Sequence, residues 1–529
     1  QTFDHGGPGW LPQAHLAVTG RSPIMGKVTR NLLANYLGAA WTGLMGVAFI
    51  PLYVHFLGME AYGVIGVFAV LQAVFVVLDM GMAPTLSREA ARFQAGAHSP
   101  QEIRELVHAV ERVYGVIALV IASSLALASP WLASEWLRPQ ALASATVAQS
   151  LMAMGVVIAL RWLATLYRST IQGLQDQVWL NLVTAGFATL RGLGVIPVLA
   201  WLAPTIQAFF IYQAVVTGLE VLALAVRMRR LLPAVPAPLR FRWQALRGIW
   251  RFAAGMSVIT VLGILLTQAD KVLLSRLLPL AQFGHYALAS TLAAALYVMV
   301  APINYAVYPR LTELVVQGDR HQLAAAYHRY CQALTLALVP AALVLAFFSD
   351  HLVLLWTRDV ELTRTVAPLV SLLAIGNMLN GLMNLPYSLQ LAHGWTRLTA
   401  TVHLVAVATL VPAIYLGVRA FGVIAAPAVW IVFSGCCVAL AVPLMHRKLL
   451  PDEMWSWYGR DVLAPMLAAF AGVGAVWLMA PAPAVDRAFS SATWLLLAAA
   501  TSLLATVSAT PLCRGPLQCS IGVLRRRLQ

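Results

Sequence analysis

Three arginines interrupt long apolar stretches of the sequence. Arg161, Thr165, Arg168 and Gln172 follow one another at spacings of four, three and four residues, so a helix would carry them on one face. Arg191 stands in the middle of a further apolar stretch. Guanidinium groups form forked hydrogen bonds with phosphate, which makes these arginines candidates for binding an anionic group. Salt bridges between helices, or long side chains that reach a polar surface, would also account for them.

A second polar stripe consists of amides. Asn377, Asn380, Asn384 and Tyr387 are spaced by three, four and three residues, which again predicts one face of a helix. Amide and phenol groups exchange hydrogen bonds with hydroxyl-rich ligands such as sugars. Hydrogen bonds between neighbouring helices are the equally weighted alternative.

Acidic residues are rare within the apolar stretches. Asp270 is followed by Lys271, and Asp79 stands at the outer end of its stretch; for these three we expect structural pairing or ion coupling, with structure favoured. Glu220, near the cytoplasmic end of its stretch, is expected to pair with a loop arginine.

The composition places these residues in a membrane protein. Of 529 residues, 60% are apolar and 10% are charged, whereas soluble domains carry about 45–50% and about 25%. The net charge of +15 resides in loops and not in an aromatic-lined groove of a soluble fold, so we expect no nucleic-acid partner.

Apolar runs long enough to cross a bilayer, which takes about 20 residues, predict fourteen transmembrane helices in an all-α fold. They lie at residues 31–55, 62–83, 108–130, 147–170, 178–201, 206–227, 251–275, 283–307, 329–349, 365–391, 396–417, 421–444, 461–481 and 491–512. The loops on one predicted side of the membrane contain 26 Lys and Arg residues, and the loops on the other side contain 7. The positive-inside rule therefore predicts that both termini are cytoplasmic.

The sequence also repeats itself at an offset of about 220 residues. Ala188-Thr189-Leu190 matches Ala408-Thr409-Leu410, and Tyr167 matches Tyr387. An even number of helices per repeat gives two parallel six-helix lobes that can enclose a site and rock against each other. The predicted segments are a largely disordered tail (1–30), an N-lobe (31–230), a basic amphipathic linker (231–250), a C-lobe (251–450), two extra helices (451–512) and a basic tail (513–529).

Glycine and charge positions near the start of each repeat carry a family resemblance. They are Asn31, Gly38, Pro51, Leu57-Gly58, Tyr62-Gly63, Asp79-Met80-Gly81 and Arg88, and then Asp270-Lys271, Gly284-His285-Tyr286 and Pro309. Over residues 27–450 the chain resembles the Wzx-type O-antigen flippases, which are polysaccharide exporters of the multidrug/oligosaccharidyl-lipid/polysaccharide (MOP) superfamily. The two extra helices resemble the fourteen-helix lipid II flippases of the same superfamily.

The resemblance implies a transporter of the bacterial inner membrane with no cofactor. It would move an undecaprenyl-diphosphate-linked oligosaccharide from the cytoplasmic to the outer leaflet through a cavity between the lobes. Its partners would be that substrate, anionic lipids of the inner leaflet, H⁺ or Na⁺ for coupling, and a polysaccharide polymerase. The three arginines (Arg161, Arg168, Arg191) would then bind the diphosphate, and the amide stripe would bind the glycan.

Two other functions remain possible hypotheses besides a lipid II-type flippase. A cation-coupled multidrug antiporter shares the fold, but it would favour acidic groups in its cavity. A membrane polymerase or ligase would need paired acids or a nucleophile on an outer loop, and no such pattern occurs. The sequence contains no G-x-x-x-x-G-K-[ST] phosphate loop, so ATP is not the expected energy source.

Overall fold

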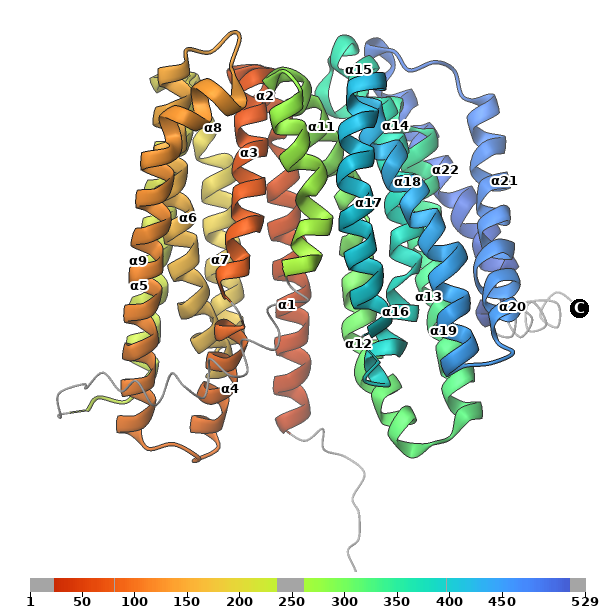
Figure 1. Ribbon diagram of the computed structural model, residues 1–529, viewed down its shortest axis with the longest axis horizontal. Coiled ribbons are helices and arrows are strands. Elements are labelled where there is room, and N and C mark those ends of the chain that lie inside the picture. The colour runs from red at the N-terminus through yellow and green to blue at the C-terminus, as the bar shows by residue number, and fades with distance from the viewer. Residues whose placement is uncertain (1–22, 80, 236–260, 396, 514–529) are drawn as a thin grey trace, which may run out of the picture.

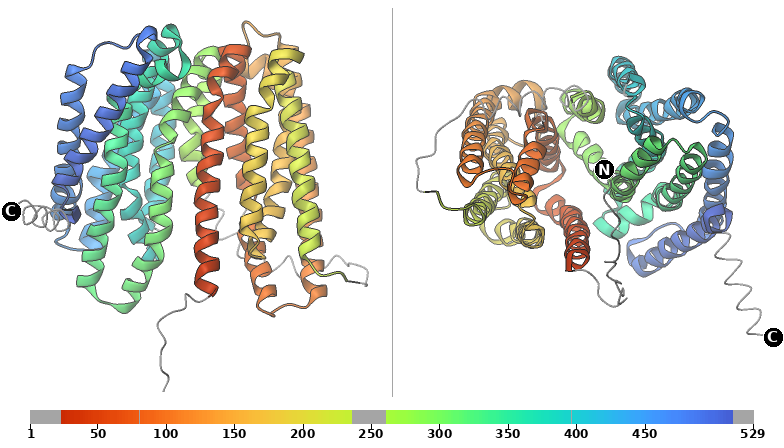
Figure 2. Two further views of the ribbon diagram at one scale, coloured as in Figure 1. Left: turned by 180° about the vertical axis from the view of Figure 1, so that it is seen from behind. Right: turned by 90° about the horizontal axis from the view of Figure 1, so that it is seen from below.

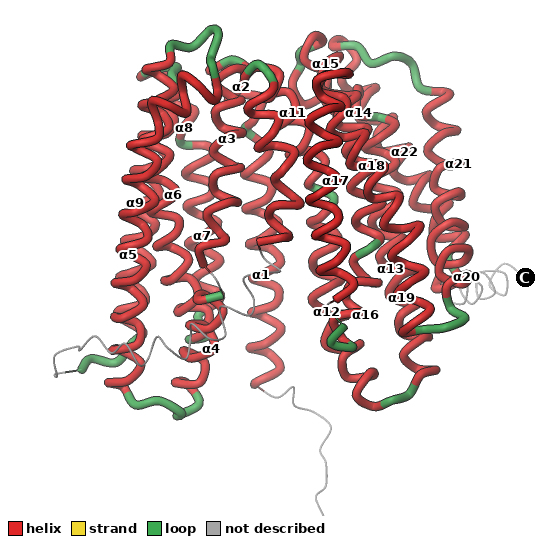
Figure 3. Tube along the Cα trace, viewed as in Figure 1, coloured by secondary structure: helices red, strands yellow, loops and turns green. Residues whose placement is uncertain are grey.

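The computed structural model describes residues 23–79, 81–235, 261–395 and 397–513. Within these ranges the regular structure is helical throughout, and no strand occurs (Figure 3). Apolar sequence explains this, because a backbone in hydrocarbon must satisfy its own hydrogen bonds, as a helix does. The all-α prediction is confirmed.

The first half of the chain forms one bundle, the N-lobe (Figure 1). Two helices are continued by short π-helical turns at Leu132–Leu137 and Val198–Leu202, and one by a 3-10 turn at Val76–Asp79. The helices are α1 (Pro23–Ala48), α2 (Ile50–Leu57), α3 (Met59–Phe75), α4 (Met82–Gln94), α5 (Pro100–Trp131), α6 (Ser144–Gly173), α7 (Gln177–Leu193), α8 (Val195–Pro197) and α9 (Ile206–Leu231).

The second half forms the C-lobe and the extra helices. It opens with a helix whose described part spans 261–277. The others are α11 (Leu280–Ala294), α12 (Tyr297–Gln317), α13 (Arg320–Phe347), α14 (Ser349–Thr357), α15 (Val360–Leu382), α16 (Asn384–Ala392), α17 (Arg397–Phe421), α18 (Ala425–Cys436), α19 (Val442–Leu449), α20 (Met454–Ser456), α21 (Ala464–Met479) and α22 (Ala488–Ala509).

Eleven stretches of the described residues, or twelve with the bent pair α11–α12 counted as one span, are long and apolar enough to cross a membrane. One stretch, Arg397–Leu449, contains both α17 and α18, which pack together after a turn at Gly422 (φ 71°). The predicted span 251–275 falls partly outside the described residues. α1 begins and α22 ends at the same end of the bundle (Figures 1 and 2), which requires an even number of crossings.

Loops that were predicted to share one side of the membrane lie at the same end of the bundle. The start of α1, the α4–α5 turn and the α12–α13 turn lie at one end, the predicted cytoplasmic end, at the bottom of Figure 1. The α2–α3 and α21–α22 connections lie at the other, the predicted outer end. α1 begins at Pro23, earlier than the predicted tail boundary at residue 30. Most of the predicted linker (231–250) and of the C-terminal tail (513–529) lies outside the described residues.

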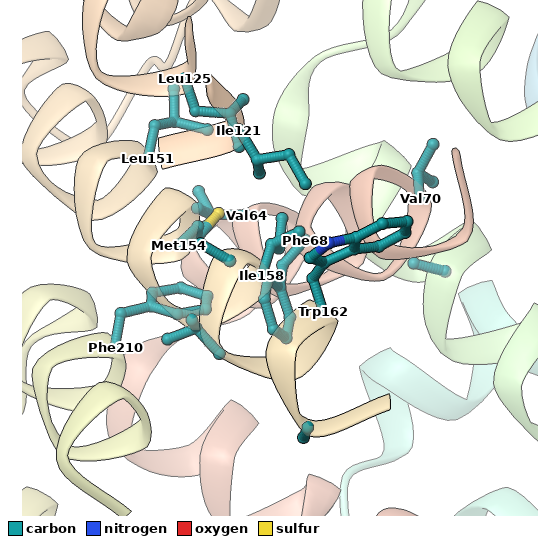
Figure 4. Packing of buried hydrophobic residues seen from close by; sticks show 14 of the residues in the cluster. Val64, Phe68, Val70, Ile121, Leu125, Leu151, Met154, Ile158, Trp162 and Phe210 are labelled. Carbon is teal, nitrogen blue, oxygen red and sulfur yellow. The ribbon is translucent and has the colours of Figure 1, made fainter. Parts of the chain in front are cut away.

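The two halves meet through α3 and α11 near the predicted outer end. Glycines allow the close approach: a Cβ on Gly284 would lie 2.6 Å from the Met59 carbonyl oxygen, and one on Gly66 would lie 2.7 Å from the Ala287 Cβ. The buried core of the N-lobe continues across this contact into α11 and α15. Figure 4 shows part of that core, where Phe68 of α3 packs near residues of α6 such as Trp162.

A polar cluster fixes the α4–α5 turn at the predicted cytoplasmic end. Glu89 accepts hydrogen bonds from Arg88 (2.9 Å) and Arg92 (3.0 Å) and pairs with His98 (2.7 Å). Burial works to raise the pKa of Glu89, but the contacts with His98, Arg88 and Arg92 outweigh it and hold that pKa below its ordinary value. The carboxylate is therefore favoured in its charged form at neutral pH.

Candidate functional site

A polar cavity of about 480 Å³ lies inside the N-lobe, among α1, α3, α6, α7 and α9. All three predicted head-group arginines (Arg161, Arg168, Arg191) line it. The seven-residue spacing of the first two places both on the cavity side of α6, as the sequence pattern predicts. Arg191 comes from α7. The structure thus brings together three residues that two different helices carry.

Glu220 of α9 joins two of these arginines. One carboxylate oxygen accepts a hydrogen bond from the Arg168 guanidinium, and the other accepts one from Arg191. The Glu220 side chain is 1% exposed, whereas those of Arg168 and Arg191 are 38% and 14% exposed. The prediction that Glu220 pairs with a loop arginine is wrong, because its partners extend from membrane-spanning helices.

Arg161 has a different environment from the other two arginines. Its Nη1 donates a hydrogen bond to the Gln72 side-chain oxygen (2.8 Å), and its guanidinium lies 5.2 Å from the centre of the Phe68 ring. Both partners are neutral, and Arg161 forms no ion pair with the residues that the structure describes. A guanidinium without a carboxylate partner in low-dielectric surroundings attracts an anion strongly.

The predicted glycan residues lie in the C-lobe, on α15 and at the start of α16. Asn377 accepts a hydrogen bond from the Trp430 indole (3.1 Å) and donates one to the Ala293 carbonyl (3.1 Å). Asn380 accepts one from the Tyr297 hydroxyl (2.9 Å). These bonds join neighbouring helices.

Two C-lobe cavities collect the amide stripe. One, of about 410 Å³, is lined by Asn377, Asn380 and the Asp270-Lys271 pair. The other, of about 220 Å³, is lined by Asn380, Asn384 and Tyr387. Asn384 stands where α15 gives way to α16, and its amide accepts a hydrogen bond from Asn304 (2.8 Å). The stripe therefore faces cavities as well as neighbouring helices.

The remaining acidic candidates have local partners. Asp270 lies 3.2 Å from the Lys271 ammonium and accepts a hydrogen bond from the Tyr286 hydroxyl (2.5 Å). Asp79 accepts hydrogen bonds from the Tyr114 hydroxyl and from the Ala83 backbone N–H (3.3 Å). Asp79 ends the 3-10 turn at the end of α3 that lies opposite the α2–α3 connection, so its predicted outer position is wrong. Within the described ranges, no group of three or more His, Cys, Asp or Glu residues could hold a metal ion.

The cavities described above lie within single lobes, and the cavity between the lobes that the resemblance implied stays a prediction. Among the described residues, those that line the cationic cavity belong to the N-lobe. Those that line the two cavities at the amide stripe belong to the C-lobe. Each lobe thus offers its own polar hollow, with cationic groups in one and amides in the other.

Solved structures share this fold at low sequence identity. A lipid II flippase MurJ in an inward closed conformation has a TM-score of 0.67 and 12% identity, covering 90% of this chain and 98% of its own. An inward-facing MATE-family multidrug transporter of the MOP superfamily has a TM-score of 0.63 and 12% identity, covering 79% and 94%. The Vibrio cholerae MATE transporter VcmN has a TM-score of 0.56 and 17% identity, covering 82% and 99%.

Sequence comparison identifies the family. No curated protein sequence matches the chain significantly. The family model described as "Polysaccharide biosynthesis protein" matches residues 28–315, which is more than half of the chain. The chain therefore belongs to the polysaccharide biosynthesis protein family, and it is a multi-pass membrane protein with the transporter fold of the MOP superfamily.

Proposed function

We propose that the protein is a flippase that moves an undecaprenyl-diphosphate-linked oligosaccharide from the cytoplasmic to the outer leaflet of the bacterial inner membrane. The observation that carries the proposal is the cationic cavity of the N-lobe, which three arginines line and where Glu220 pairs with two of them. An ionisable group at the centre of a membrane helix costs about 2.5–3.5 kcal/mol on insertion scales. Three such groups around one hollow are therefore expected to serve an anionic ligand.

In this proposal the two lobes divide the substrate. The arginines bind the diphosphate by charge-assisted hydrogen bonds. The amide groups of the stripe that face the cavities bind sugar hydroxyls. The prenyl tail stays in the surrounding lipid. The diphosphate and the sugar leave the arginines and the amides when the lobes rock and the site opens to the other side of the membrane.

The contact between α3 and α11 supports alternating access. It closes the lobes against each other near the predicted outer end, with glycines such as Gly284 at the contact. The open arrangement would then face the cytoplasm, with both termini on that side. No ATP site is part of the proposal. The Lys271 and Tyr286 contacts of Asp270 favour a structural pair there over H⁺ or Na⁺ coupling.

A lipid II-type flippase is the second candidate. The observation in its favour is the pair α21–α22 beyond the two lobes, together with a fold match that covers 90% of this chain. Both candidates use a polyprenyl diphosphate and would need the same cationic cavity. A multidrug antiporter is less favoured, because cationic drugs would be repelled by a cavity with an excess of arginine.

Depletion of the protein in its host tests the proposal. We expect lipid-linked oligosaccharide to accumulate on the cytoplasmic leaflet, where an impermeant glycosidase or oxidant added outside cannot reach it. Normal delivery to the outer leaflet would contradict flipping. Accumulation of lipid II instead of the oligosaccharide would select the second candidate.

A further inference from the structure

Glu220 is the only carboxylate among the residues that line the N-lobe cavity in the described chain. It is almost fully buried, and it contacts one guanidinium with each oxygen. A buried carboxylate is stable only when such partners compensate its charge. Conversely, Arg168 and Arg191 repel each other unless a negative group lies between them.

The repeat shows that the fold itself does not need this charge cluster. At the offset of 220 residues that aligns Leu190 with Leu410, the counterparts of the four charged residues are uncharged. Arg161, Arg168, Arg191 and Glu220 correspond to Gly381, Ser388, Val411 and Leu440. The C-lobe packs its helices with uncharged residues at these four positions, so the cluster in the N-lobe calls for a reason other than helix packing.

The cluster retains charge and donors for a ligand. Three guanidiniums and one carboxylate leave a net charge of +2 in the cavity. In the part of the chain that the structure describes, Arg161 forms no ion pair, and its guanidinium contacts the neutral Gln72 and Phe68. A diphosphate that links a prenyl chain to a sugar carries one negative charge on each phosphate. Its charge therefore balances that of the cavity.

We propose that Glu220 is the resident counter-ion of the head-group site and that it sets the net charge of the site to the value that a diphosphate neutralises. This inference rests on the function proposed above. In the empty cavity Glu220 holds Arg168 and Arg191 side by side, with their remaining N–H groups available to the ligand. It also limits the positive charge of the cavity, so that a diphosphate is bound but can still leave.

Glu220 is thus a positioning residue that acts through the arginines. Replacing it by glutamine keeps the size of the side chain but raises the cavity charge by one. We expect E220Q to bind a diphosphate more tightly and release it more slowly. Both KM and kcat for flipping should fall, each by about 10-fold, because one unit charge near the ligand has at least this effect at the effective dielectric of a protein site.

Thermal unfolding of the full-length protein in lipid nanodiscs gives an independent readout. E220Q should unfold at a lower temperature than the wild type, because two arginines lose their counter-ion. Inorganic diphosphate should raise its unfolding temperature more than that of the wild type, whereas inorganic monophosphate at equal ionic strength should have a smaller effect. Asp176→Asn is the matched control, since it removes the carboxylate from the Arg227–Asp176 pair (2.6 Å), and neither residue lines the cavity.

E220D provides a second variant if E220Q does not fold. Its shorter side chain keeps the charge but cannot reach both guanidiniums as Glu220 does, so its response to diphosphate should lie between those of E220Q and the wild type. Equal diphosphate shifts in the wild type, the Glu220 variants and the Asp176→Asn control would overturn the inference. So would an E220Q variant whose KM and kcat for flipping equal those of the wild type.

Failure of this inference and failure of the proposed function give different results. If Arg161→Ala abolishes flipping but E220Q has the wild-type kinetics and diphosphate response, only the role of Glu220 is refuted. If the arginine variants flip at the wild-type rate and diphosphate stabilises none of the proteins, the head-group site itself is refuted.

Discussion

Alternating access predicts that a single methyl group at the α3–α11 contact will change the balance between conformations. In Gly284→Ala the added Cβ would lie 2.6 Å from the Met59 carbonyl oxygen and 3.1 Å from the Gly63 nitrogen. Both neighbours are backbone atoms of α3, which belongs to the other lobe, so no flexible side chain can move aside. The lobes must separate at this end to accommodate the methyl group.

The magnitude follows from the tightness of the contact. Overpacking of this kind costs typically about 1–3 kcal/mol, and here the cost falls only on the conformation in which α3 and α11 touch. A difference of that size changes the ratio of two conformations by about 5-fold to 150-fold. Gly284→Ala should therefore shift the protein from the conformation described above toward one that is open at the predicted outer end.

The assay is a distance measurement between spin labels at the predicted cytoplasmic end. Cysteines that replace the exposed Ala97 and Gln317 would place one label on each lobe. Gly284→Ala should increase the population with the shorter distance, as that end closes. The control is Gly472→Ala, whose Cβ would lie 2.9 Å from the Thr501 carbonyl oxygen between α21 and α22. If both variants keep the wild-type distance distribution, the reasoning about the lobe contact is refuted.

Three further predictions concern the candidate site and the α4–α5 turn. Arg161→Ala should lower flipping about 10-fold or more without lowering protein level, because a charge-assisted hydrogen bond contributes about 1.5–3 kcal/mol; full activity in reconstituted vesicles would refute its role. Asn377→Ala should lower the unfolding temperature more than Asn380→Ala, because it leaves an indole N–H and a backbone carbonyl unpaired; thermal unfolding of both variants checks this, and equal losses would contradict it. The depressed pKa of Glu89 contributes stability that is present above its ordinary value of 4.5 and is lost as the pH falls through the lower folded value. Glu89→Gln should therefore weaken the loss of stability at acid pH when unfolding is measured from pH 7 to pH 3. An unchanged acid dependence would refute the assignment.

Local periodicity predicted much of the site. The spacing of Arg161 and Arg168 fixed their common face, because seven residues make about two turns of a helix. The amide stripe was likewise predictable as a face, and both stripes do line cavities. Which helices would stand opposite could not be predicted this way, because that depends on packing between distant segments.

Glu220 shows where reasoning from periodicity stops. It is 29 residues from Arg191 and 52 from Arg168 in sequence, and no spacing rule joins residues on separate helices. Two features of the sequence pointed to this pairing. A carboxylate within an apolar stretch requires a cationic partner, and other apolar stretches contain arginines without a carboxylate nearby in sequence. The same reasoning did not identify Asn304 as the partner of Asn384.

Boundaries were predicted less well than elements. α1 begins earlier than the predicted first span, and the span predicted at 283–307 is a bent pair with an angle of 41° between α11 and α12. Apolar composition marks where a chain can lie in lipid, but it does not mark where a helix bends.

The most direct test of the central claim is flipping of a fluorescent undecaprenyl-diphosphate oligosaccharide in vesicles that contain the purified protein. Dithionite added outside would quench only the label in the outer leaflet. The account predicts that the wild type makes nearly all the label accessible and that a variant with Arg161, Arg168 and Arg191 replaced by glutamine leaves about half protected, as empty vesicles do. Equal accessibility with the wild type and with the triple variant would contradict a diphosphate site built on these arginines.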